Sequence, residues 1–158
     1  MEETNPPPPK PATILGGVFA EHNYRSLYKD TVDYISRSYD PCVISALASL
    51  LSEPDFPSSL LETLNGLCYR RKDGCWTENT IHPYDINLLP RDIDRSHFYQ
   101  YQSRFRLLKH NPLACVRFAY SCSHKCTFCY RTMMNCGRYV HKDVRNFAEE
   151  IRNIQCDN

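Results

Sequence analysis

The sequence has no apolar run that approaches the roughly 20 residues of a membrane-spanning helix. Its proline-rich beginning also lacks the apolar core of a signal peptide. Neither sign of charge is in excess, because 19 basic and 18 acidic side chains give a formal net charge of +1. A nucleic-acid-binding surface is usually accompanied by a basic excess. We therefore expect a cytoplasmic protein with no membrane span and no nucleic-acid partner.

The nine cysteines are expected to be reduced thiols or metal ligands rather than a disulfide framework, because cytosolic proteins rarely keep disulfides. The six histidines show no paired metal spacing. Four cysteines are scattered along the chain, which is typical of packing, whereas the other five are clustered, which is typical of a site. The clustered residues are Cys115, Cys122, Cys126, Cys129 and Cys136.

Three of the clustered cysteines, Cys122, Cys126 and Cys129, have the spacing C-x3-C-x2-C, with Phe128 just before the third. Three thiolates on one loop can hold three irons of a 4Fe-4S cluster and leave the fourth iron open to a small molecule. A closed structural zinc site normally has four protein ligands. The triplet therefore favours a reactive cluster over a structural site.

Strand and helix patterns alternate along the chain, which predicts the α/β class. Residues 1–11 are expected to form a disordered proline-rich tail. Residues 12–80 are predicted to form one domain and residues 81–112 an irregular connector that packs across a surface. The last segment, 113–158, holds the cysteine triplet.

Within the first domain, we predict a short strand over residues 12–15 that ends in the turn Gly16-Gly17. A helical stretch over 24–29 and a second strand over 32–35 follow. The next helix is predicted to begin near Pro41, and a hairpin is expected to turn at Asp73-Gly74.

In the last segment, residues 114–120 are predicted to form a strand, and a helix is expected beyond Gly137. The apolar face of this helix is expected to consist of Val144, Phe147, Ile151 and Ile154. Glu149-Glu150 is interpreted as part of its solvated face. The triplet then follows the carboxyl end of a strand, the usual position of active sites in parallel α/β folds.

Residues 116–130, which contain the triplet, resemble the first strand and cluster loop of radical S-adenosylmethionine enzymes, with Phe128 at the aromatic position of that family. The order of features before the triplet is similar to the cobalamin-binding class, which includes methyltransferases and the anaerobic magnesium-protoporphyrin ester cyclase. In that class, a Rossmann-like cobalamin-binding domain ends in a hairpin resembling residues 66–74, so residues 12–80 would be the C-terminal part of such a domain. A connector resembling residues 86–95 then leads to the first β/α unit of the partial barrel.

The resemblance implies a 4Fe-4S cluster on Cys122, Cys126 and Cys129, with S-adenosylmethionine on the open iron. Reductive cleavage would give a 5'-deoxyadenosyl radical that abstracts hydrogen from a small-molecule substrate. A reductant such as ferredoxin or flavodoxin is implied as a partner. Phe128 and Tyr130 would pack near the cluster or the adenine.

The resemblance also places Gly16 and Gly17 beside the nucleotide tail of cobalamin. However, the Asp-x-His-x-x-Gly motif that often ligates cobalt in this class is absent, since His22 is followed by Asn-Tyr-Arg. The chain has one predicted strand of the barrel before the triplet and one predicted helix after it. We therefore expect a truncated or fragmentary radical S-adenosylmethionine protein, whose ancestral reaction was methyl transfer or cyclisation and whose substrate binding needs further barrel strands.

Two alternatives remain open at this stage. The first is a small zinc-binding interaction module, in which Cys136 or His124 completes a tetrahedron with the three cysteines of the triplet. The second is a non-functional remnant whose cysteines bind nothing.

Overall fold

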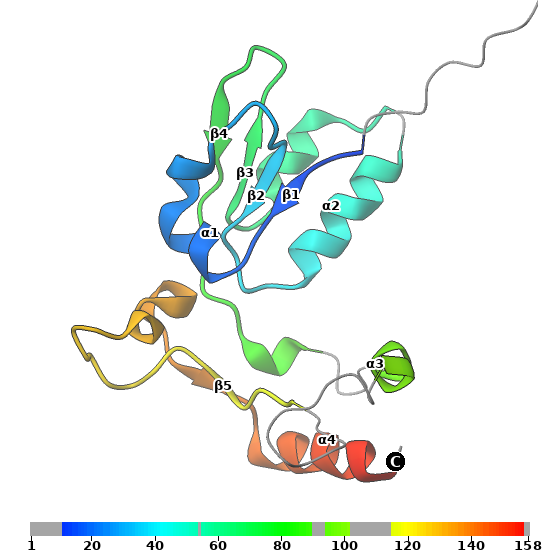
Figure 1. The fold of residues 1–158 in the computed structure, drawn as a ribbon, viewed down its shortest axis with the longest axis vertical. Helices are drawn as coiled ribbons and strands as arrows, with labels where there is room; N and C mark the ends of the chain where they lie inside the picture. The colour runs from blue at the N-terminus through cyan, green and yellow to red at the C-terminus, as the bar shows by residue number, and fades with distance from the viewer. Residues whose placement is uncertain (1–10, 54, 90–93, 102–114, 157–158) are drawn as a thin grey trace, which may run out of the picture. The chain divides into compact units, whose positions relative to one another are not determined.

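The structure is a computed structural model that describes residues 11–53, 55–89, 94–101 and 115–156. The expected tail falls almost wholly outside these ranges. The chain is of the mixed α/β class and divides into two compact units, Met1–Tyr84 and Asp85–Asn158 (Figure 1). Each unit is described by itself.

A four-stranded mixed sheet forms the centre of the first unit. Its order is β1 (Ile14–Leu15), β2 (Tyr34–Ser36), β3 (Leu67–Arg70) and β4 (Trp76–Glu78). β1 and β2 are parallel, whereas β3 is antiparallel to both β2 and β4. The predicted hairpin is therefore present, and Gly74 adopts a φ of 84° at its turn, which favours glycine.

Helices pack on both faces of this sheet (Figure 1). Side chains alternate along a strand, so neighbouring residues of β3 enter different cores. Cys68 packs with Ala20 of α1 (Val18–Asn23), whereas Leu67 packs with Leu47 of α2 (Cys42–Ser52). Two 3-10 segments complete the unit: η1 (Tyr24–Leu27) and η2 (Ser58–Thr63).

The start of α1 differs from the sequence prediction. The helical stretch was expected over 24–29, but the α-helix begins at Val18, directly after Gly17, and residues 24–27 form the 3-10 turn. Gly17 has a φ of 90°, a backbone conformation that lets the chain change direction between strand and helix within one residue. The helix that follows Pro41 has its expected position.

The second unit contains a two-stranded antiparallel ribbon, β5 (Ala119–Tyr120) and β6 (Val140–His141). Only the last two residues of the strand predicted over 114–120 are β-structure within the described range, and β6 was not predicted. Between them lie η5 (Tyr130–Thr132) and η6 (Met134–Gly137). The connector region contributes η3 (Ile86–Leu88) and α3 (Ser96–Tyr101).

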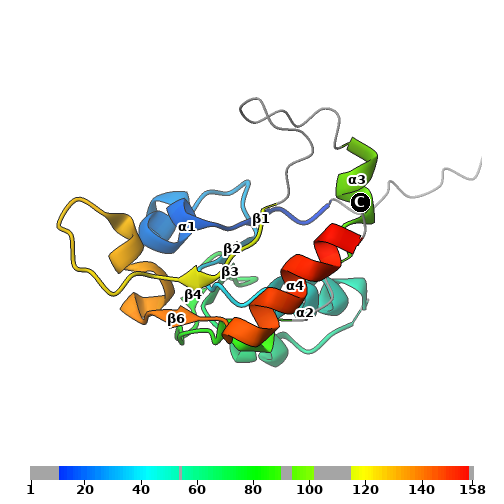
Figure 2. The ribbon, with the colours of Figure 1, turned by 90° about the horizontal axis from the view of Figure 1, so that it is seen from below.

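The long helix α4 (Val144–Cys156) follows β6 (Figure 2). Its inward stripe differs from the predicted one, because Val144 is 68% exposed and Ile151 is 37% exposed. Ile154 and Glu150 are buried instead, and the ring of Phe147 packs against that of Phe118. Glu150 is thus not on a solvated face, since it is paired with two cations of its own unit.

Asn87 attaches the connector to this helix and to β6. Its side-chain amide donates to the carbonyl of His141 at 3.1 Å and accepts from the backbone N–H of Asp143 at 2.8 Å. Ile86, beside it, is fully buried. None of the helices in the described ranges has both the length and the apolar composition of a membrane span.

Candidate metal centre

The cysteine loop begins at a strained residue. Ser121 follows β5 with a φ of 63°, a conformation that is unfavourable for residues other than glycine, and it is only 4% exposed. Its hydroxyl oxygen has no hydrogen-bond partner among the described residues. Both features lower stability, so the packing around Tyr120 and Ser121 must hold this residue in place.

The three cysteines of the triplet lie on the irregular loop that leaves β5, drawn in yellow in Figure 1. Cys126 is exposed, and Cys122 and Cys129 are half-buried. The backbone N–H of Cys129 donates to the carbonyl of Cys126 at 3.2 Å, which closes a turn. No disulfide forms among the described cysteines, so the triplet is present as thiols.

Cys126 and Cys129 share a surface hollow of about 450 Å³, and Cys122 does not line it. The described part of the chain contains no group of three His, Cys, Asp or Glu side chains arranged to hold a metal ion. The hollow is lined by Lys125, Cys126, Thr127, Phe128, Cys129, Tyr130, Thr132, Met133 and Gly137. The structure thus brings two of the predicted ligands together and leaves the third apart.

A left-handed turn forms another part of this site. Asn135, Cys136 and Gly137 adopt successive φ values of 54°, 57° and 72°. The Asn135 amide donates to the carbonyl of Arg138 at 3.1 Å, and Asn135 is only 2% exposed. Sequence reasoning missed this turn, although asparagine and glycine are the residues that most readily adopt such angles.

The two aromatic residues assigned to the site both line the hollow and project from it. Phe128 is 91% exposed, and Tyr130 is 53% exposed. Such exposure is unusual for a phenylalanine ring, which is ordinarily buried. Their packing against a cofactor stays a prediction.

The glycine pair lies in the other unit and is explained by local geometry. A side chain at Gly16 would make only ordinary contacts with Ser36, and one at Gly17 would meet open space. The turn therefore does not bring the backbone close to another group of this chain. Gly17 is needed for its φ of 90°, and the predicted proximity of this pair to a cofactor is untested.

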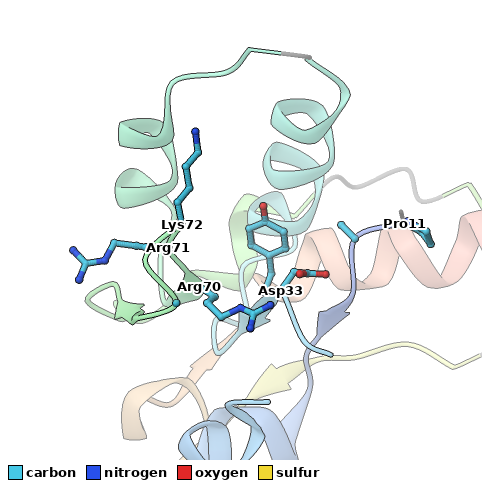
Figure 3. A pocket seen from close by; sticks show the side chains of 8 residues that line it. Pro11, Asp33, Arg70, Arg71 and Lys72 are labelled. Atoms are coloured by element: carbon cyan, nitrogen blue, oxygen red, sulfur yellow. The ribbon is translucent and has the colours of Figure 1, made fainter. Parts of the chain in front are cut away.

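A second hollow, of about 670 Å³, lies at the edge of the sheet where β1 and β2 begin (Figure 3). Three cations and Asp33 line it, but Arg70 pairs with Asp30 at 3.0 Å and Arg71 pairs with Asp73 at 3.6 Å. Figure 3 shows Arg71 pointing away from Asp33. Burial, and secondarily the charge of Asp33, raises the pKa of Tyr34, which also lines this hollow. Because two of its cations are neutralised, this hollow is a weaker candidate site.

The donor type of the triplet fits an iron–sulfur cluster. Thiolate is the ligand such clusters use, and the three thiols occupy only eight consecutive positions on an accessible loop. By contrast, burial raises the pKa of Cys68, so this core thiol is not readily ionised or available to a metal. Cys42 and Cys75 are exposed, but neither belongs to the cluster between Cys115 and Cys136.

Comparisons with protein-family models, with curated proteins and with solved structures find no match for this chain.

Proposed function

We propose that the chain binds a 4Fe-4S cluster through Cys122, Cys126 and Cys129 and is a protein of the radical S-adenosylmethionine type. The observation that carries the proposal is the placement of three thiols on one open loop directly after β5, two of them on a shared hollow. The loop ligands would act as thiolates, since metal binding requires deprotonation. The Rossmann-like origin of the first unit belongs to the same proposal.

Side chains of this loop have definable tasks in such a site. The thiolates would bind the cluster, and the rings of Phe128 and Tyr130 would cover adenine and exclude water from the hollow they line. When bound, the cluster supplies the electron that cleaves S-adenosylmethionine. A ferredoxin-like or flavodoxin-like protein would deliver this electron, and a small molecule would be the substrate.

Cobalamin is not part of the proposed cofactor set. The cobalt-ligating motif named above is absent from the sequence, and the φ of Gly17 accounts for the turn that would approach the cofactor.

A zinc site is the second candidate, and one observation favours it. Gly137, which follows Cys136 in the sequence, lines the same hollow as Cys126 and Cys129, although the three cysteines do not form a group arranged to hold a metal ion in the described part of the chain. Zinc takes four such ligands in a tetrahedron, whereas the cluster needs only the triplet. Cys136 therefore distinguishes the two candidates.

The test is to reconstitute the full chain anaerobically with iron and sulfide, reduce it, and record its electron paramagnetic resonance spectrum. Adding S-adenosylmethionine should change the spectrum of the reduced cluster and release 5'-deoxyadenosine. The Cys136→Ala chain should behave in the same way. A cluster whose spectrum does not respond to S-adenosylmethionine would contradict the proposed reaction, and a chain that takes up zinc but no iron would contradict the cluster.

A further inference from the structure

Charge is divided unevenly between the two units. The Asp85–Asn158 unit has twelve Lys or Arg and seven Asp or Glu, a net charge of +5. The Met1–Tyr84 unit has seven basic and eleven acidic residues, a net charge of −4. Between Asp94 and Asp143 there are nine Lys or Arg and no acidic residue at all. The net charge of +1 for the whole chain therefore conceals a strongly basic segment.

Only some of these nine cations are available to a partner. Lys142 is buried and Arg95 is half-buried, and both bind Glu150. Arg104, Arg106 and Lys109 lie outside the described residues. The other four are exposed, and none of them forms an ion pair with a described residue: Arg117, Lys125, Arg131 and Arg138.

One of the four lines the hollow of the cysteine loop, and two more are next in sequence to residues that line it. Lys125 lines it, Arg131 follows the lining residue Tyr130, and Arg138 follows the lining residue Gly137. The rings of Phe128 and Tyr130 project from the same hollow. We call Lys125, Arg131, Arg138, Phe128 and Tyr130 the basic aromatic surface.

The neighbouring β5–β6 ribbon continues this pattern. The rings of Phe118 and His141 stack with centroids 5.5 Å apart, and Tyr139 lies 5.9 Å from His141. Phe118 is 36% exposed and Tyr139 is 43% exposed. Tyr139 follows Arg138 directly, so exposed rings extend from the hollow onto the ribbon.

We propose that the basic aromatic surface binds single-stranded nucleic acid. Unpaired Lys and Arg side chains attract the phosphate backbone, and the guanidinium groups of Arg131 and Arg138 match the oxygens of a phosphate. Unstacked bases can lie against exposed rings such as those of Phe128 and Tyr130. The expectation of no nucleic-acid partner was based on the charge of the whole chain, which averages over two units of opposite sign.

The exposed rings favour a single strand over the other anionic partners. The bases of a duplex are stacked on one another, so they cannot cover the projecting ring of Phe128. An acidic protein would complement the cations, but it would not by itself explain why rings alternate with them. The cations and rings are present whether or not the cysteines carry metal. Because Phe128 and Tyr130 would also cover the adenine of S-adenosylmethionine in the proposed function, the two ligands should compete for these rings.

The experiment measures binding of the full chain to a fluorescein-labelled oligouridylate of about 12 nucleotides. This length is within the range of site sizes of proteins that bind single-stranded nucleic acid. Anisotropy titrations are made at several salt concentrations, with metal-free and with iron-loaded protein. In the double variant Arg131→Gln/Arg138→Gln, the slope of log K against log salt should become less negative by about 1.4, since each phosphate contact on a single strand contributes about 0.7 to its magnitude. The double variant Arg71→Gln/Lys72→Gln removes the same charge from exposed positions of the other unit and should leave the slope unchanged.

Phe128→Ala keeps every charge and tests the stacking. It should weaken binding at least about fivefold, the lower end of the effect of removing one stacking ring. Absence of oligonucleotide binding at low salt in both metal states would overturn the proposal, as would equal slopes for the two double variants. An unchanged affinity of Phe128→Ala, or equal affinity for duplex DNA or inorganic polyphosphate, would show a simple polyanion site and overturn the assignment to single strands. Binding only of an acidic redox protein would overturn it in favour of a protein partner.

Discussion

Glu150 of α4 and Lys142, which follows β6, form an ion pair in which both side chains are less than 10% exposed. Arg95 of the connector binds the other carboxylate oxygen of Glu150 at 2.9 Å. One buried carboxylate thus joins the connector, the ribbon and the helix of the second unit. The cysteine loop lies between β5 and β6 in the chain, so its position depends on this junction.

Replacing Glu150 with Gln is expected to destabilise the second unit by about 3–5 kcal/mol, because the buried charge of Lys142 and the half-buried charge of Arg95 would be left without a partner. The loss is measured by urea unfolding followed by circular dichroism and by amide hydrogen exchange of α4. Arg152→Gln, at an exposed position of the same helix, should cost less than about 1 kcal/mol. Equal losses for the two variants would mean that the buried pair does not hold the unit together.

The first unit should have a stability that depends on pH through Glu78. The hydrogen bonds that Arg25 donates to Glu78 are the main cause that lowers the pKa of this carboxyl, to about 2. Burial acts in the opposite direction, and hydrogen bonds from the hydroxyl groups of Tyr28 and Tyr24 lower the pKa further. Because the folded pKa lies below the unfolded one, this carboxylate stabilises the unit at neutral pH. The contribution should be lost as the pH falls from about 5 towards 2.

Urea midpoints between pH 7 and pH 2.5 test this dependence, with Trp76 fluorescence as the probe, since Trp76 stacks on Tyr28 at 4.3 Å. Glu78→Gln should flatten the pH profile below pH 5, whereas Glu62→Gln, at an exposed position, should not. Arg25 is 72% exposed, so solvent screening will keep the effect small. If Glu78→Gln and the unaltered chain lose stability in parallel, the network is not the cause.

Ser121→Gly is expected to stabilise the second unit by about 1 kcal/mol, because glycine adopts positive φ without strain and brings no buried hydroxyl. The matched change Ser123→Gly lies in the same loop at a residue without positive φ, so it should bring no gain. Thermal unfolding monitored by circular dichroism compares the two. A gain at Ser123 and none at Ser121 would contradict the strain that the structure assigns to the start of the loop.

Short-range signals predicted much of the first unit. Gly16-Gly17, Pro41 and Asp73-Gly74 each fix a turn or a helix start through backbone preferences that operate within a few residues. The α/β class followed from the alternation of these elements. The early start of α1 was missed because Gly17 was interpreted only as the end of a strand.

The second unit was less predictable because long-range contacts determine it. β6 has two residues and exists through its pairing with β5, about twenty positions earlier in the chain. Glu150 is a charged residue on an amphipathic helix, and only the distant Arg95 and Lys142 explain its burial. The triplet itself was visible in the sequence, but the hollow beside it depends on the left-handed turn at Asn135.

The central claim is that Cys122, Cys126 and Cys129 hold an iron–sulfur cluster, and metal content under anaerobic conditions tests it most directly. Four chains are reconstituted with iron and sulfide in parallel: the unaltered chain, Cys126→Ala, Cys115→Ala and Cys136→Ala. We predict about four irons and four sulfides per chain for the unaltered, Cys115→Ala and Cys136→Ala proteins, and loss of both from Cys126→Ala. One zinc per chain that is lost with Cys136→Ala, or no bound iron in any chain, would contradict the claim.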